Sequence, residues 1–221
     1  MEILKSAKEL YNKGKWNEVI NIIDTFFVSF EDNDIAEANR IKGWSYYYKG
    51  IKGPEEEKNI NIQNAVNSFK IALSLLRKLL LSEKEKAKDT EVSAKNGLAL
   101  SLWILGKKEE AKIESLKATE KFPQEPSIWN IRAILYRWAK DFEESVKICE
   151  KVYETAIKKK DFRTAGHGKH NRADALKELG KLGEAKKDYQ EALKLYKKYE
   201  KESGESAKFH IDKVEEKISN L

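Results

Sequence analysis

The chain has 221 residues, of which 36% are charged and 40% hydrophobic, and its formal net charge is +6. With a mean hydropathy of −0.70 and no run of about 18 apolar residues, a membrane-spanning helix is excluded. The one cysteine, Cys149, excludes an intrachain disulfide framework and a multi-cysteine zinc site. The apolar pattern predicts helices, in chain order, over residues 2–13, 16–30, 34–49, 56–81, 84–105, 108–121, 126–139, 142–159, 162–179, 182–202 and 205–219.

The positive charge comes almost entirely from lysine. Lysine and arginine total 43 against 37 acidic residues, and only six of the cations are arginine. Because arginine is the preferred residue for phosphate and base contacts, this is a weak signature of nucleic-acid binding. The Lys/Glu/Ile-rich composition is thermophile-like. The N-terminus lacks the layout of a signal peptide, so we expect a cytoplasmic protein.

Four stretches of the chain share one pattern around a turn. They begin at Gly14, Gly106, Lys140 and Gly180, and each places a small or short residue five positions after the turn. Each turn is also preceded, seven positions earlier, by an alanine: these are Ala7, Ala99, Ala133 and Ala173. A fifth, interrupted copy has Gly43 as its small residue and Gly50 as its predicted turn.

The segment after each turn repeats as well. A short residue is followed by further packing residues four and seven positions on, which places all three on one helix face. The sets are Val19/Ile23/Phe26, Ala65/Phe69/Ala72, Ala111/Ser115/Ala118, Ser145/Cys149/Val152 and Ala185/Tyr189/Ala192. Each unit is therefore predicted to be a helix–turn–helix whose small residues let two antiparallel helices approach closely.

This pattern resembles the tetratricopeptide repeat, a 34-residue helical hairpin. The copy that starts at Pro126 has Trp129, Ala133, Tyr136 and Phe142 at the spacings of the family. The resemblance implies an all-α fold, an α-solenoid of antiparallel helix pairs that forms a right-handed superhelix. About five repeats would make a single domain over residues 1–221.

Two segments depart from the regular repeat. Gly50 and Ala65 are 15 positions apart instead of five, so we predict an insertion over residues 51–61 within repeat two. We expect this insertion to be an exposed loop or a frayed helix start. The last helix, residues 205–219, has no second helix to pair with and is predicted to be a C-terminal cap.

No catalytic constellation is recognisable in the sequence. Cys149 occupies a packing slot and is interpreted as a buried structural thiol. His167 and His170 share a helix face, and with His210 they could bind a metal, but histidine spacing alone is a weak signal. We therefore expect no enzyme activity, no cofactor and no metal site.

A second stripe on the first helix of each repeat carries the candidate binding residues. At about 100° per residue, this stripe is separate from the face that packs against the second helix. In the tetratricopeptide-repeat family the first helices line the concave surface. The predicted peptide-binding groove consists of Lys8, Tyr11, Arg40, Trp44, Tyr47, Tyr48, Asn96, Leu100, Trp103, Asn130, Ile134, Arg137 and Trp138.

The function predicted from these features is a non-catalytic protein–protein interaction scaffold or adaptor. It would bind a peptide or a helical segment of another protein in the aromatic-lined groove, as a monomer or a weak homodimer. The alternative for the aromatic rings is that neighbouring helices or the cap bury them. Two other functions remain open: binding of single-stranded nucleic acid by stacking on Trp44, Trp103 and Trp138, and a histidine-based metal site near the C-terminus.

Overall fold

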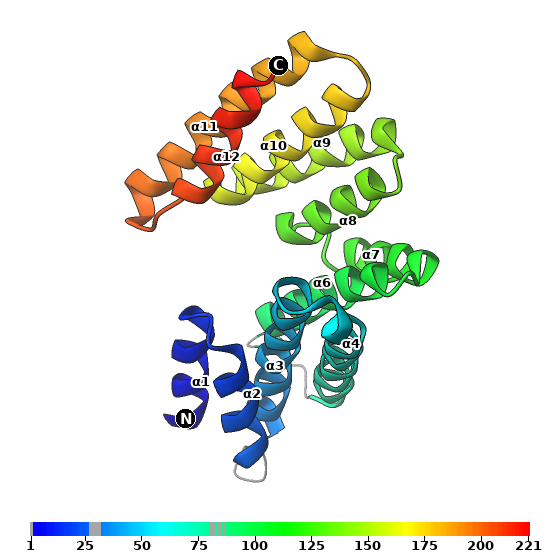
Figure 1. Ribbon diagram of the computed structural model, residues 1–221, viewed down its shortest axis with the longest axis vertical. Coiled ribbons are helices and arrows are strands. Elements are labelled where there is room, and N and C mark those ends of the chain that lie inside the picture. The colour runs from blue at the N-terminus through cyan, green and yellow to red at the C-terminus, as the bar shows by residue number, and fades with distance from the viewer. Residues whose placement is uncertain (1, 27–31, 80–82, 84, 86) are drawn as a thin grey trace. The chain divides into compact units, whose positions relative to one another are not determined.

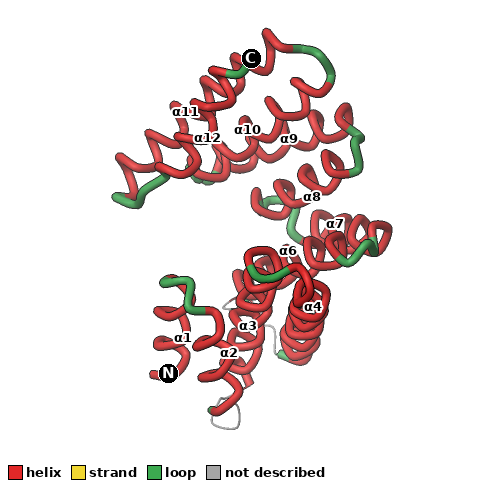
Figure 2. The backbone as a smooth tube through the Cα atoms, in the orientation of Figure 1, coloured by secondary structure: helices red, strands yellow, loops and turns green. Residues whose placement is uncertain are grey.

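The structure is a computed structural model in which the described residues form helices joined by turns and short loops (Figure 2). It describes residues 2–26, 32–79, 83, 85 and 87–221. The chain divides into two compact units, residues 1–115 and 116–221. The single domain over residues 1–221 stays a prediction.

The first unit is made of antiparallel helix pairs (Figure 1). Helix α2 packs against α1 and α3, α3 against α4, and α6 against both α3 and α4. The helices are α1 (Glu2–Asn12), α2 (Trp16–Thr25), α3 (Asp32–Lys52), α4 (Glu55–Lys78) and α6 (Lys88–Ile104), followed by α7 (Lys108–Lys121), within which the unit boundary falls.

The second unit repeats the same arrangement. Each of α8, α9, α10 and α11 packs against the next, and α12 packs against α11. The helices are α8 (Pro126–Trp138), α9 (Phe142–Lys158), α10 (Phe162–Glu178), α11 (Leu182–Ser203) and α12 (Lys208–Ser219). The predicted helices are therefore present in the described residues. Some predicted helix ends fall in residues 27–30, 80–81, 84 and 86, which lie outside the described residues.

The turns between paired helices are closed by residues in the left-handed conformation. Gly14, Gly106 and Gly180 have φ values of 71°, 78° and 73°, and Lys140 takes the same place with a φ of 62°. The N–H of the residue after each turn position then bonds back across the helix end, as from Lys15 to the carbonyl of Leu10 at 3.0 Å. The four turns that the repeat pattern predicts are confirmed.

The small residues that precede the turns are buried in the core. Ala7, Ala133 and Ala173 are fully buried, and Ala99 is 1% exposed. In the second unit, Ala173 belongs to the same core cluster as Ala185 and the ring of Tyr189. The repeat register derived from the sequence is therefore the register of the core, with one exception: Phe26, placed in a packing slot, is 43% exposed.

The turn predicted at Gly50 is wrong. Helix α3 continues to Lys52, and the turn consists of Gly53 and Pro54. Gly50 is buried because the side chain of Ile62 lies against it: a Cβ on Gly50 would be 2.8 Å from Ile62 Cδ1. Gly50 therefore allows α3 and α4 to pack closely and does not reverse the chain.

Most of the inserted residues lengthen two helices, and only Gly53 and Pro54 form the turn between them. Ile51 and Lys52 end α3, and residues 55–61 are the first turns of α4, with Glu55, Glu56 and Glu57 near its positively polarised N-terminus. Residues 51–57 are exposed, but Asn61 is only 4% exposed. The loop alternative for the insertion is thus wrong, whereas the alternative of an exposed helix start agrees with the structure up to Ile60, which is 66% exposed.

Helix α12 caps the second unit. Gly204, in the left-handed conformation with φ 72°, ends α11, and α12 begins at Lys208, slightly later than predicted. Its buried face, Ile211 and Val214, joins the core cluster of α10 and α11. Its other face is polar except for Phe209, which is 72% exposed.

Candidate functional site

The predicted groove residues fall in both units. Nine lie in the first unit, on α1, α3 and α6: Lys8, Tyr11, Arg40, Trp44, Tyr47, Tyr48, Asn96, Leu100 and Trp103. The other four lie on α8 in the second unit: Asn130, Ile134, Arg137 and Trp138. We call the first set the inner stripe of the first unit.

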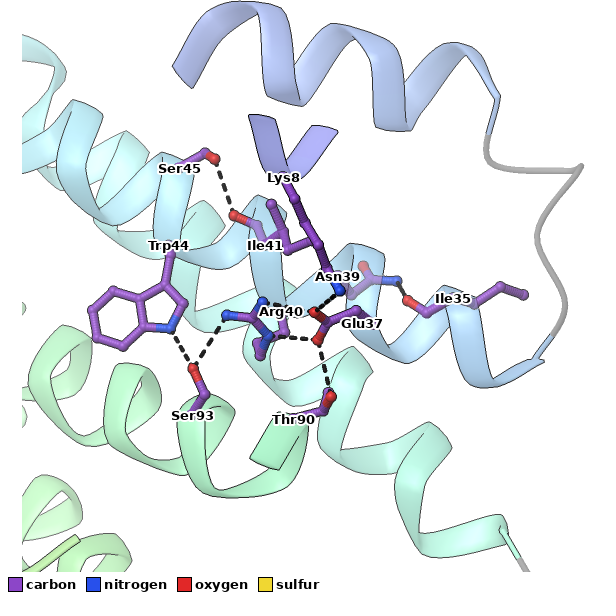
Figure 3. Close-up of polar contacts among 10 residues, drawn as sticks. All are labelled: Lys8, Ile35, Glu37, Asn39, Arg40, Ile41, Trp44, Ser45, Thr90 and Ser93. Atoms are coloured by element: carbon purple, nitrogen blue, oxygen red, sulfur yellow. Dashed lines mark hydrogen bonds and ion pairs between the residues drawn. The ribbon is translucent and has the colours of Figure 1, made fainter. Parts of the chain in front are cut away.

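A network of charged and polar side chains joins α1, α3 and α6 along this stripe (Figure 3). Glu37 is at its centre and receives two hydrogen bonds from the Arg40 guanidinium, at 2.6 and 2.8 Å. The Lys8 ammonium lies 3.0 Å from the same carboxylate, and the Thr90 hydroxyl donates to it at 2.9 Å. Glu37 therefore has partners on all three helices.

These partners change the ionisation of Glu37. Burial alone would raise its pKa, but the hydrogen bonds and charges of Arg40 and Lys8 outweigh burial and lower the pKa to about 2. The carboxylate is therefore ionised at neutral pH. In turn it neutralises part of the positive charge of Arg40.

The network also fixes the indole of Trp44. Its Nε1–H donates to the Ser93 hydroxyl at 2.9 Å, and Arg40 donates to the same oxygen at 3.3 Å. Figure 3 shows Trp44 and Arg40 converging on Ser93 from α3. The sequence analysis missed Thr90. It lies three positions before Ser93 on α6, and residues at this spacing lie on the same face of a helix.

The aromatic rings of the stripe contact one another. Trp44 lies 5.3 Å from Tyr47 and 5.9 Å from Tyr48, measured between ring centroids. Tyr48 is also 6.2 Å from Tyr11 and stacks on Trp16 of α2 at 5.9 Å. The rings therefore form one cluster, in which each ring limits the rotamers of its neighbours.

Some of the stripe residues are buried and others are accessible. Tyr47, Asn96 and Leu100 are 7–8% exposed, and burial raises the pKa of Tyr47 to about 12. Tyr11, Trp44, Tyr48 and Trp103 are only half-buried. The surface that a ligand could reach on this unit therefore consists of the half-buried rings together with Lys8 and Arg40.

In the second unit the stripe residues of α8 meet α10. Asn171 donates to the Asn130 side chain at 2.9 Å, and Arg137 donates to Asn171 at 3.4 Å. Arg137 also pairs with Asp174 at 3.2 Å. The polar residues of α8 thus connect the two first helices of adjacent repeats, whereas Trp138, which is 41% exposed, is accessible.

Asp174 is the centre of a second charge network. Besides Arg137 it contacts the ammonium of Lys217 on α12, and the Tyr189 hydroxyl donates to it at 2.7 Å. Burial opposes ionisation of this carboxyl, yet its contacts with His170, Lys217 and Tyr189 hold its pKa below the usual value. The cap helix is therefore attached to α10 by an ion pair as well as by its apolar face.

A pocket of about 390 Å³ opens beside this network. The residues around it come from the end of α8, the α8–α9 turn and helices α9 to α12; the cationic ones are Arg137, Lys140, Lys177 and Lys217. The pocket also has an aromatic part that includes Trp138 and Tyr189. Of the predicted groove residues, it thus contains Arg137 and Trp138.

The three histidines lie near one another between α10, α11 and α12, but they do not converge on one point. The rings of His167 and His210 are 4.7 Å apart, whereas His170 Nδ1 faces the Tyr196 hydroxyl at 3.5 Å. Burial lowers the pKa of His167 to about 3 and of His170 to about 4, so both are neutral at pH 7. Within the described part of the chain, no group of three histidine, cysteine or acidic side chains is placed to hold a metal ion.

Cys149 is part of the core of the α8–α9 hairpin. It is fully buried beside Ala133 and Val152, and burial raises the pKa of its thiol to about 12. A thiol that is neutral and inaccessible has the properties of a packing residue. This agrees with its interpretation from the sequence.

The arrangement of helices and turns defines a class of protein, the helical-repeat solenoids built from antiparallel helix pairs. Within this class, residues 167–199 match the family model described as "Tetratricopeptide repeat". The match spans most of α10 and α11, the two helices whose small residues Ala173 and Ala185 share one core cluster. Residues 167–199 are therefore similar to a tetratricopeptide repeat, in a stretch where the sequence pattern predicts one.

Solved structures share the fold over most of the chain. MamA AMB-1 matches with a TM-score of 0.55 and 11% identity, covering 88% of this chain and 98% of that chain. A putative kinesin light chain of Podosopora anserina with nearly identical TPR-like repeats matches with a TM-score of 0.62 and 15% identity, covering 90% and 95%. At these identities the similarity is one of fold.

The curated proteins include no match to this sequence. Within the described residues, no helix is both long enough and apolar enough to cross a membrane.

Proposed function

We propose that the protein is a non-catalytic scaffold that binds a peptide or helical segment of another protein on the inner stripe of the first unit. Repeat proteins of this class generally act in protein–protein interaction, and their extended surfaces are built from successive hairpins. Because fold alone does not set function, the argument rests on the side chains of the stripe.

The observation that carries the proposal is the fixed, half-buried indole of Trp44. Its polar edge is bound to Ser93, and its ring belongs to a cluster with Tyr48 and Tyr11. Rings that are already ordered lose little conformational entropy when a ligand covers them. Buried aromatic anchors of this kind carry a large share of the binding energy at protein interfaces.

The two arginines of the stripe support a protein ligand over a nucleic acid. Arg40 is paired with Glu37, and Arg137 with Asp174. An arginine whose charge is already neutralised contributes little to phosphate binding. We propose accordingly that the ligand is a polypeptide and that the stacking alternative on Trp44, Trp103 and Trp138 does not apply. A cytoplasmic location and a monomer or weak homodimer remain part of this proposal.

The proposal can be tested with a displayed library of random peptides selected on the full chain. The affinities of the recovered peptides are then measured by calorimetry for the wild type and for the variants Trp44→Ala and Trp103→Ala. We expect each variant to lose about tenfold or more in affinity. Phe209→Ser removes an exposed ring outside the stripe and serves as the matched control, which should bind as the wild type does.

The far-ultraviolet spectrum and the melting temperature of each variant establish that it remains folded. The proposal is wrong if selection yields no saturable peptide, or if the recovered peptides bind folded Trp44→Ala and Trp103→Ala as tightly as the wild type.

A further inference from the structure

The pocket in the second unit has the size of a site for a few side chains. Its volume of about 390 Å³ lies in the range of small-ligand pockets, roughly 300–1,000 Å³. It is formed by the ends of α8 and α10 together with α11 and α12. Helices of two repeats and the cap therefore contribute to a single concave surface.

The charge around this pocket is positive and is only partly neutralised. Four cations face two carboxylates, Asp174 and Glu178. Asp174 is already engaged by Arg137 and Lys217. In the part of the chain that the structure describes, neither Lys140 nor Lys177 forms an ion pair with a carboxylate.

The two lysines differ in this respect from many others on the same unit. Lys147, Lys151 and Lys194 each pair with a glutamate three positions away on their own helix. Lys140 lies in the α8–α9 turn and Lys177 in the last turn of α10, and both face the pocket. Their uncompensated charge favours an anionic ligand.

An apolar surface adjoins these charges. The indole of Trp138 is 41% exposed, and Phe142 and Tyr189 line the same pocket. A tryptophan exposed at the mouth of a cationic pocket can accept an apolar side chain while the lysines bind an adjacent carboxylate. A free inorganic anion would leave the aromatic part unused.

We infer that this pocket binds an acidic segment of a partner protein, with an apolar side chain against Trp138 and a neighbouring aspartate or glutamate at Lys140 and Lys177. The inference rests on the proposed function in that the ligand is again a polypeptide. It concerns a different surface, however, because none of its residues belongs to the inner stripe of the first unit.

The probe for this site is a fluorescein-labelled peptide, acetyl-Asp-Asp-Phe-Glu-Asp-amide, titrated with the full chain at low salt. Its blocked ends ensure that only side-chain carboxylates are tested. Two companion peptides separate the contributions: one replaces the acids by Asn and Gln, and the other replaces Phe by Ala. We expect saturable binding of the acidic peptide, weakened by salt, and about tenfold or more loss for either companion.

The matched variants are Lys140→Gln with Lys177→Gln, and Lys187→Gln as a control at an exposed lysine of α11. We expect the double variant to lose about tenfold or more in affinity and the control to bind as the wild type does. Equal binding of the acidic and neutral peptides, equal binding by the double variant, or no binding up to about 1 mM overturns the inference.

The two binding proposals can fail separately. Trp44→Ala should leave the affinity for the acidic peptide unchanged, because Trp44 is not part of the pocket. If Trp44→Ala weakens binding of the acidic peptide while the double lysine variant does not, the first unit is the peptide site and the inference about the pocket is wrong. If only the double lysine variant weakens binding, both of the acidic peptide and of the library-selected peptides, the inner stripe is not the binding site.

Discussion

The ring of Phe69 occupies the space next to Gly97 in which any other residue would place its Cβ. A Cβ on Gly97 would lie 2.2 Å from Phe69 Cζ, and one on Gly43 would lie 2.7 Å from Cε1 of the same ring. Phe69, on α4, is thus enclosed between α3 and α6 by two glycines. The absence of two side chains is what allows a fully buried phenylalanine at this position.

We predict that Gly97→Ala lowers the free energy of unfolding by roughly 1–3 kcal/mol, because the added methyl group overpacks the contact with Phe69. Urea unfolding measures the change. Combining Gly97→Ala with Phe69→Leu should restore part of the loss. The control is Gly183→Ala on α11, where a Cβ would meet nothing within 4 Å; equal effects of the two alanines would contradict the packing argument.

Two lysines adopt the left-handed conformation, and at these positions we expect substitution by glycine to stabilise the protein. Lys140 and Lys160 have φ values of 62° and 57°, which cost a residue with a Cβ roughly 1 kcal/mol compared with glycine. Lys140→Gly and Lys160→Gly should each raise the melting temperature. Gly106→Ala, at a φ of 78°, should lower it. Destabilisation by both glycine substitutions would show that the lysine side chains contribute more than the strain costs.

Glu37 gives the stability a defined dependence on pH. Its pKa in the folded protein, about 2, lies below the ordinary value of 4.5, so its contribution is complete above pH 4.5 and is lost as the pH falls toward 2. The loss is at most about 3 kcal/mol. Unfolding free energies measured between pH 6 and pH 2 should therefore fall less steeply for Glu37→Gln than for the wild type, whereas Glu109→Gln, at an exposed position, should follow the wild type.

Cys149 should react with a thiol reagent only when the second unit opens. Its side chain is fully buried, and its pKa is raised to about 12. We expect the reaction with Ellman's reagent to be at least about a thousandfold slower in the native protein than in urea. Ser206→Cys in a Cys149→Ala background supplies an exposed thiol as the control. Equal rates in native and unfolded protein would disprove the structural role.

The sequence predicted the parts of the fold that depend on spacing. A small residue seven positions before a turn and a packing residue five positions after it must meet when the chain folds back, and Ala173 and Ala185 do so. Gly50 was placed wrongly because glycine has two uses that look alike in a sequence. It permits a left-handed turn, as at Gly14, and it permits close packing, as at Gly50 against Ile62.

The candidate site was harder to predict, because it depends on contacts between distant residues. The helical angle identified Trp44 as a stripe residue but did not indicate its hydrogen bond to Ser93, 49 positions away. Asn171 and Asn130, 41 positions apart, likewise bond to each other. The pocket depends on Lys217, whose position is fixed only once the cap packs against α11.

The long hairpin of α3 and α4 has a practical consequence for work on this protein. At about 1.5 Å per residue, α4 with its 24 residues is about 36 Å long, against about 21 Å for the 14 residues of α7. Its exposed tip, Gly53–Pro54, lies outside both proposed binding surfaces. A fluorescent protein or new chain termini placed between these two residues would interrupt neither α3 nor α4.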